Sequence, residues 1–144
     1  MNDVTPIKLH IKSSQSDCQG TMDTMEFYTE GKYYENQDSR YISYEESEIS
    51  GLGGTTTMLK LGKHEAVLIR SGAISSKMTF RVGCETENPY TTEYGEFDLS
   101  ILTHKLDINI CNSRIDSVYL KYRLSINAGD VYTNEMTIRI LYNV

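Results

Sequence analysis

The feature that most constrains this chain is a period-two alternation of apolar and polar side chains. Near the start, Ile7, Leu9 and Ile11 alternate with polar residues. Successive side chains of a β-strand point to opposite faces of a sheet, so each such set lies on one face. The later apolar sets are Met25 and Phe27; Met78, Phe80 and Val82; Phe97, Leu99 and Ile101; Leu106, Ile108 and Ile110; Val118, Leu120, Tyr122, Leu124 and Ile126; and Met136, Ile138 and Ile140. No segment keeps apolar residues at helical spacing for three turns, and the pattern therefore predicts an all-β protein.

Turn-forming residues separate these apolar sets at intervals of roughly 8–12 residues, which is typical of a barrel or a sandwich. The predicted turns are Gln19-Gly20, Glu30-Gly31, Asn36 to Asp38, Ser50 to Gly54, Gly62, Gly83, Asn88-Pro89, Tyr94-Gly95, Asn112-Ser113 and Asn127 to Asp130. Closing a sheet on itself removes its edges. We therefore predict one domain over residues 1–144, a single antiparallel up-and-down barrel of about eight to ten strands. A two-sheet sandwich is the alternative.

Composition limits the partners and the compartment. The net charge is −6, with 20 acidic and 14 basic residues, which argues against nucleic acid and against a polybasic membrane anchor. The three cysteines are isolated in the sequence and odd in number, so a disulfide framework is not indicated. Because no apolar run reaches roughly 18 residues and the first residues lack a signal-peptide core, we expect a cytoplasmic protein.

Several segments, in order along nearly the whole chain, carry a family resemblance. They are Tyr44 to Glu48, Gly51 to Thr57, Leu68 to Gly72, Tyr90 to Thr92, Tyr94-Gly95 with Phe97, and a tail with Tyr122, Leu124, Asn134, Ile138 and Ile140. Together they resemble the bacterial YwiB-like family. The resemblance implies a calycin-like barrel, related in shape to lipocalins and fatty-acid carriers. It implies no activity, because that family is one of unknown function, and this chain has no tryptophan with which to form the lipocalin Gly-x-Trp signature.

The charged residue of greatest interest is Arg70, which follows three aliphatic residues in a predicted strand. Buried charges must be paired. We expect Arg70 to point into the barrel and to meet Glu45 or Glu46. Such a pair would hold the anionic head of a ligand or would fix the strand register, and the structural role is the one that we favour.

The acidic run at Glu45, Glu46 and Glu48 precedes a Gly-rich segment, Gly51 to Gly54. On a strand, Tyr44, Glu46 and Glu48 would share a face, and converging carboxylates can perform acid–base chemistry. The simpler interpretation is a solvated strand face. The Gly-rich segment runs into a β-pattern without a following Gly-Lys-Ser/Thr, so a wide turn is favoured over a phosphate loop.

Three residues of a later strand, Tyr90, Thr92 and Tyr94, also alternate with a period of two. Tyrosines at a barrel mouth could hold a flat or polar ligand, and ordinary cross-strand packing is the alternative.

Metal-ligand spacings are lacking, and no cofactor is indicated. Nothing selects a base among the three histidines, so an enzyme is the least supported class.

Two functions remain. The first is a non-catalytic small-molecule-binding barrel, which requires an interior pocket of roughly 300–1,000 Å³. Its candidate ligand-binding residues are Tyr44, Glu45, Glu46, Arg70, Tyr90, Thr92 and Tyr94. The alternative is a structural or protein-interaction module that acts through its outer surface as a homodimer, for which a large exposed apolar patch would be needed.

Overall fold

The computed structural model describes residues 4–142, and of residue 50 only the backbone. Over these residues the chain forms ten strands and one short 3₁₀ helix. They are β1 (Thr5–Asp17), β2 (Met22–Asn36), β3 (Ser39–Glu45), η1 (Glu48–Ser50), β4 (Thr55–Leu61), β5 (Glu65–Gly72), β6 (Ser75–Arg81), β7 (Glu85–Thr92), β8 (Gly95–Cys111), β9 (Arg114–Ile126) and β10 (Val131–Leu141).

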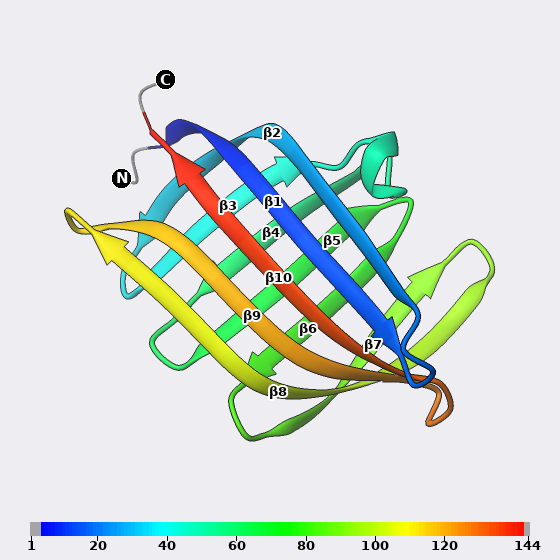
Figure 1. Ribbon diagram of the computed structural model, residues 1–144. Helices are drawn as coiled ribbons and strands as arrows, with labels where there is room; N and C mark the ends of the chain where they lie inside the picture. Colours follow the sequence, from blue (N-terminus) through cyan, green and yellow to red (C-terminus); the bar gives the residue numbers. More distant parts are fainter. Residues whose placement is uncertain (1–3, 143–144) are drawn as a thin grey trace.

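The ten strands form one closed antiparallel barrel. Each strand pairs with its neighbours in the sequence, and β1 closes the ring by pairing with β10, as Figure 1 shows. The all-β closed barrel predicted from the alternation is confirmed, and the sandwich alternative is wrong. Closure leaves no edge strand in the ring, although β6 and β7 are joined by only two residue pairs, and a closed sheet avoids edge-to-edge association.

The predicted apolar faces supply the core. Most residues fully buried in it belong to the alternating pattern or continue it, as for Leu9, Phe80, Ile101 and Leu120. Ile115 is an exception, because it is fully buried three residues before Val118 and so is out of phase with the alternation of β9. Two predicted members instead lie exposed: Val82 (54%), which follows the end of β6, and Ile110 (51%), which lies near the end of β8. The register of β8 against β9 shifts between Thr103 and Lys105 and again after Asn109, so the strand does not keep one face inward throughout.

Two predicted turns lie inside strands. Glu30-Gly31 belongs to β2, where a Cβ on Gly31 would come 2.6 Å from the Ser43 carbonyl oxygen. The glycine therefore permits a close approach of two backbones and makes no turn. Asn88-Pro89 belongs to β7, where Pro89 pairs with Asp98 of β8. On the side that faces β6, Pro89 has no paired residue, because the β6–β7 pairing includes only two residue pairs. A proline is tolerated at such a position, since no backbone N–H is needed there.

Side chains replace backbone bonds where the β6–β7 ladder stops. Asn88 is 3% exposed, and its Oδ1 accepts from the Thr79 backbone N–H at 2.9 Å. Its Nδ2 donates to the carbonyl oxygens of Leu99 and Thr86. Thr86 Oγ1 donates to the Thr79 carbonyl oxygen at 2.7 Å. We call these contacts the Asn88 bridge, and they hold together a wall that the backbone alone leaves open.

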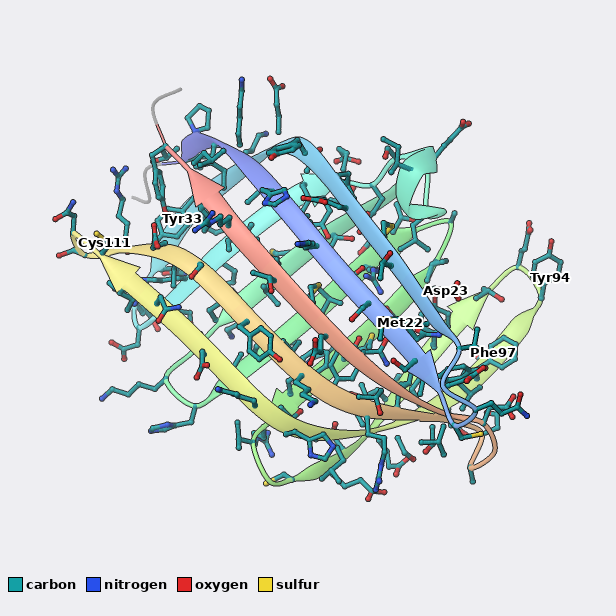
Figure 2. All side chains as sticks on the ribbon, in the orientation of Figure 1. Met22, Asp23, Tyr33, Tyr94, Phe97 and Cys111 are labelled. Atoms are coloured by element: carbon teal, nitrogen blue, oxygen red, sulfur yellow. The ribbon has the colours of Figure 1, made fainter. Side chains whose placement is uncertain are left out.

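The two ends of the barrel differ. One end, the mouth end, carries the hairpins that join β1–β2, β3–β4, β5–β6, β7–β8 and β9–β10, and η1 lies in the second of these (Figure 1). Met22, Asp23, Tyr94 and Phe97 lie there, whereas Tyr33 lies at the opposite, closed end (Figure 2). At the closed end Tyr33 packs edge-on against Tyr142, whose hydroxyl donates to the Ile115 carbonyl oxygen.

Candidate functional site

A cavity of about 410 Å³, partly open to solvent, occupies the mouth half of the barrel. Its volume lies within the range of roughly 300–1,000 Å³ typical of small-molecule pockets. The apolar part of its lining is Ile11, Met25, Phe27, Leu52, Met78, Phe97, Leu99, Leu124, Ile126 and Met136. The polar part is Ser13, Gln15, Tyr44, Glu46, Arg70, Tyr90, Tyr122, Asn134 and Glu135. The cavity thus has a mixed wall, in which apolar and polar residues are about equally numerous.

Cross-strand register assembles one polar side of the cavity. Tyr44 pairs with Thr57, Thr57 with Arg70, Arg70 with Ser76 and Ser76 with Tyr90, in a line across β3 to β7. We call these five residues the polar row. Because directly opposite residues share a face of the sheet, the register places all five on the inner face. Polar residues at five neighbouring inward positions interrupt a core that is otherwise apolar.

Glu46 and Arg70 meet beside this row. Glu46 directly follows β3, its side chain is only 2% exposed, and its carboxylate accepts a hydrogen bond from Thr57 Oγ1. Arg70 Nε lies 3.8 Å from Glu46 Oε2, and the Arg70 side chain is 18% exposed. The expected meeting of Arg70 with one of two acidic residues is therefore found, and the partner is Glu46.

The neighbouring Glu45 lies on the other side of the wall. It is exposed and accepts from Thr56 Oγ1 at 2.9 Å, because adjacent residues of a strand face opposite sides. The interpretation as a solvated strand face is thus right for Glu45 and wrong for Glu46. Glu48 shares no strand face with either residue, because β3 ends at Glu45 and Glu48 begins η1 at the surface.

Some buried donors in this region lack a hydrogen-bond partner among residues 4–142. Arg70 Nε, Ser76 Oγ and Asn134 Nδ2 are buried and make no hydrogen bond within the part of the chain that the structure describes. Leaving a buried polar group unpaired costs about 1–3 kcal/mol, so such groups call for a functional explanation. Two of them, on Arg70 and Asn134, line the cavity.

Sequence reasoning singled out neither Asn134 nor Tyr122 as a site residue. Both line the cavity, and they are paired across β10 and β9. A signal was present, because Asn134 stands two residues before Met136 and so continues the apolar set of β10 with an amide. A polar residue at an inward position of an apolar strand indicates a pocket or a buried network.

The predicted tyrosine face is only partly found at the cavity. Tyr90 lines it, whereas Thr92 and Tyr94 are not among its lining residues. β7 ends at Thr92, so Tyr94 lies in the turn, 86% exposed, at the tip of the β7–β8 hairpin (Figure 2). Thr92 Oγ1 accepts from the Tyr94 backbone N–H at 3.1 Å, as expected of a turn residue. Phe97, on the other side of this turn, contributes the ring that faces the cavity.

Burial perturbs two tyrosines of the cavity. Desolvation raises the pKa of the Tyr44 hydroxyl well above its usual range, the nearby Glu46 carboxylate raises it further, and Arg70 opposes the shift. Desolvation likewise raises the pKa of Tyr122, again with Arg70 acting in the opposite direction. Both hydroxyls therefore remain protonated at neutral pH and can donate or accept a hydrogen bond.

The raised pKa of Tyr44 predicts a loss of stability in alkali. The folded state holds the proton above pH 10 while the unfolded chain releases it, so the free energy of unfolding falls as pH rises through 10. Tyr44→Phe should reduce that slope by up to about 1.4 kcal/mol per pH unit. Urea unfolding at pH 8 and at about pH 11 measures the difference. Tyr94→Phe, on an exposed ring, is the control, and equal slopes in both variants would contradict the expectation.

Other common functional groupings are not seen in this part of the chain. Within residues 4–142, no three His, Cys, Asp or Glu side chains lie close enough together to hold a metal ion. Over the same residues, none of the helical structure has the length and apolar character needed to cross a bilayer.

Comparison with known proteins agrees with the fold and the sequence signatures. A family model described as a domain of unknown function, DUF1934, matches residues 9–138. This chain belongs to the DUF1934 family. It is 30% identical over 138 residues to the uncharacterized β-barrel protein YwiB of Bacillus subtilis, a match that covers 96% of this chain and 94% of the relative.

The fold comparison gives the same relationship. The crystal structure of YwiB from Bacillus subtilis superposes with a TM-score of 0.75 and 29% identity, covering 94% of this chain and 92% of that one. The family resemblance inferred from the sequence is thereby confirmed. DUF1934 is described as a domain of unknown function, so the function of this chain must be argued from its own site.

Proposed function

We propose that this barrel binds, without catalysis, a small amphipathic molecule in the mouth cavity. One observation carries the proposal: the buried donors Arg70 Nε and Asn134 Nδ2, unpaired within residues 4–142, line a cavity of about 410 Å³. These two residues belong to β5 and β10, which lie on opposite sides of the ring, and a polar ligand group that accepts a hydrogen bond from either donor would satisfy it. Its apolar body would lie against residues such as Phe27, Leu99 and Met136. Burial of apolar surface at about 25 cal/mol per Å² would supply most of the affinity.

The arrangement of the polar groups supports binding over a purely structural role. A pair that only fixed strand register would need no open space beside it, yet Glu46 and Arg70 both line the cavity. The calycin-like shape that the family resemblance implies, a barrel that encloses a ligand, is compatible with this proposal. We also place the protein in the cytoplasm, because Cys18, Cys84 and Cys111 are all exposed and unbonded, as reduced thiols would be.

The intact mass of gently purified protein tests the proposal and its alternative together. We expect native mass spectrometry to show extra mass that disappears on denaturation, because a ligand held in a partly enclosed cavity dissociates slowly. A clean multiple of the chain mass with no ligand would favour the homodimer alternative. Among the described residues the exposed apolar side chains are spread over both ends, as for Met22, Tyr94, Val82 and Ile110, and do not single out one dimer face.

A cavity-filling variant gives the direct test. Leu124→Trp should fill the space beside Leu99 and reduce binding of the uncharged probe N-phenyl-1-naphthylamine by at least about tenfold in isothermal titration, or about 1.4 kcal/mol. Leu141→Trp, at the far end of β10, is the matched control and should bind like the unmodified protein. Equal binding by all three proteins would place the probe elsewhere and contradict the proposal.

A further inference from the structure

We propose that the ligand of the mouth cavity is uncharged and that its polar end is a hydrogen-bond acceptor such as an amide or ketone carbonyl. This inference rests on the proposed function and names the ligand class of the same site. It excludes fatty acids and other carboxylates, which a barrel with an interior arginine would otherwise be expected to hold. Three observations support it: the chemistry of the unpaired groups, the charge of the interior and the charge of the rim.

The unpaired groups that line the cavity are donors. A guanidinium has N–H donors and no acceptor, and an amide nitrogen is likewise a donor. Arg70 Nε and Asn134 Nδ2 are the atoms left without a partner among residues 4–142. The Glu46 carboxylate, the strongest acceptor at the site, already receives the Thr57 hydroxyl and lies 3.8 Å from Arg70 Nε. The ligand group that completes this site must therefore accept hydrogen bonds.

The interior charges cancel before any ligand enters. The buried charges of the lining are one positive charge on Arg70 and one negative charge on Glu46. Glu135 also belongs to the lining, but its side chain is 45% exposed and its carboxylate lies 3.7 Å from the Nζ of Lys121, which is not a lining residue. A carboxylate placed against Arg70 would leave a net negative charge in a poorly hydrated space beside Glu46, and an ammonium group would leave a net positive one. Burying a charge without its own partner is strongly unfavourable. A carbonyl accepts the same hydrogen bonds and adds no charge.

The charge of the rim of the mouth also disfavours an anionic ligand. The five mouth-end hairpins, taken as residues 17–23, 45–55, 71–75, 92–98 and 126–131, contain no lysine or arginine. Besides the buried Glu46, their acidic residues are Asp17, Asp23, Glu45, Glu48, Glu93, Glu96, Asp98 and Asp130. Charge of one sign around a cleft lowers the local concentration of ions of that sign, and salt screens the effect. An anionic ligand would be disfavoured both at the entrance and inside.

Three probes with the same alkyl chain test the inference. Octanamide, octanoate and octylammonium, titrated at pH 7 by calorimetry, differ at the polar end in charge and hydrogen bonding. We expect octanamide to bind at least about tenfold more tightly than either ion. Raising NaCl from about 0.02 M to about 0.5 M should strengthen octanoate binding and leave octanamide unchanged. Octanoate binding as tightly as octanamide or more tightly would overturn the inference.

A pair of adjacent glutamates provides matched variants. Glu46→Gln makes the interior net positive while keeping an acceptor for Thr57, so the octanoate-to-octanamide affinity ratio should rise at least about tenfold. Glu45→Gln makes the same charge change on the outer face and should alter the ratio far less. An unchanged ratio in a folded Glu46→Gln variant would overturn the inference. If that variant does not fold, the NaCl titrations of octanoate and octanamide with the unmodified protein test the inference instead.

The outcomes separate this inference from the proposed function. If N-phenyl-1-naphthylamine binds in the cavity and octanamide does not exceed octanoate, the ligand class is wrong and the binding function stands. If neither the naphthyl probe nor any octyl compound binds, the binding function itself fails, and the inference fails with it.

Discussion

Asn88→Ala is expected to lower the free energy of unfolding by about 3 kcal/mol. The substitution removes the Asn88 bridge. It leaves two backbone groups, the Thr79 N–H and the Leu99 carbonyl, without the hydrogen bonds of the Asn88 side chain, at a site where that side chain is 3% exposed. Each buried group left unpaired costs about 1–3 kcal/mol. The expected loss of stability is large because, apart from the Asn88 bridge, only two residue pairs of the backbone ladder join β6 to β7.

Urea unfolding followed by circular dichroism measures this effect. Asn109→Ala is the matched control, since Asn109 is exposed and donates one hydrogen bond to Ser117 on the neighbouring strand. We expect the control to change stability by less than about 0.5 kcal/mol. Similar losses in the two variants would show that the barrel wall does not depend on the Asn88 bridge.

Arg70→Met is expected to destabilise the fold by about 3 kcal/mol at pH 7. The substitution keeps the volume of the side chain and removes its charge, so the Glu46 carboxylate, 2% exposed, loses the cation beside it. Removing one partner of a buried ion pair commonly costs 3–5 kcal/mol, and about 3 kcal/mol is appropriate here because Arg70 is partly exposed.

The double variant Arg70→Met with Glu46→Leu should recover most of that loss. Replacing a whole buried pair by apolar residues is often neutral, because both desolvation penalties disappear together. A double-mutant cycle on urea unfolding at pH 7 measures the coupling between the two sites. Additive losses, with the double variant less stable than Arg70→Met alone, would show that the two side chains do not act as a pair.

Local pattern was sufficient to predict the architecture. A period of two fixes which side chains face inward, and short connections pair sequence neighbours, so an antiparallel meander follows from those two facts. Closure of the sheet is favoured because it removes the strand edges. The inward position of Arg70 was predictable for a related reason, because a charge that follows aliphatic residues in a strand needs a partner inside. Glu45 and Glu46 are adjacent in the sequence. Deciding which of the two faces inward requires the register of β3 against β4.

The cavity itself was beyond sequence reasoning. Its existence depends on how tightly side chains from nine strands pack, and no local pattern reports a packing density. The sequence predicts a turn at Asn88-Pro89, because Asn-Pro usually marks one. In the folded chain the Asn88 amide instead bridges a gap that appears only when β6 and β7 diverge. The sequence places Tyr94 both on the face of Tyr90 and Thr92 and in a predicted Tyr94-Gly95 turn, and in the folded chain it lies in the turn between β7 and β8.

The pairing of β1 with β10 also has a consequence for the order of events during synthesis. Ten residue pairs join these strands, although more than a hundred residues separate them along the chain, so β1 is synthesised long before β10. Until β10 emerges, the outer edge of β1 has no partner and is a template for a strand of another chain. Sheets dominated by such distant pairings also fold slowly. We therefore expect chaperone protection of the nascent chain to matter most before β10 has been synthesised.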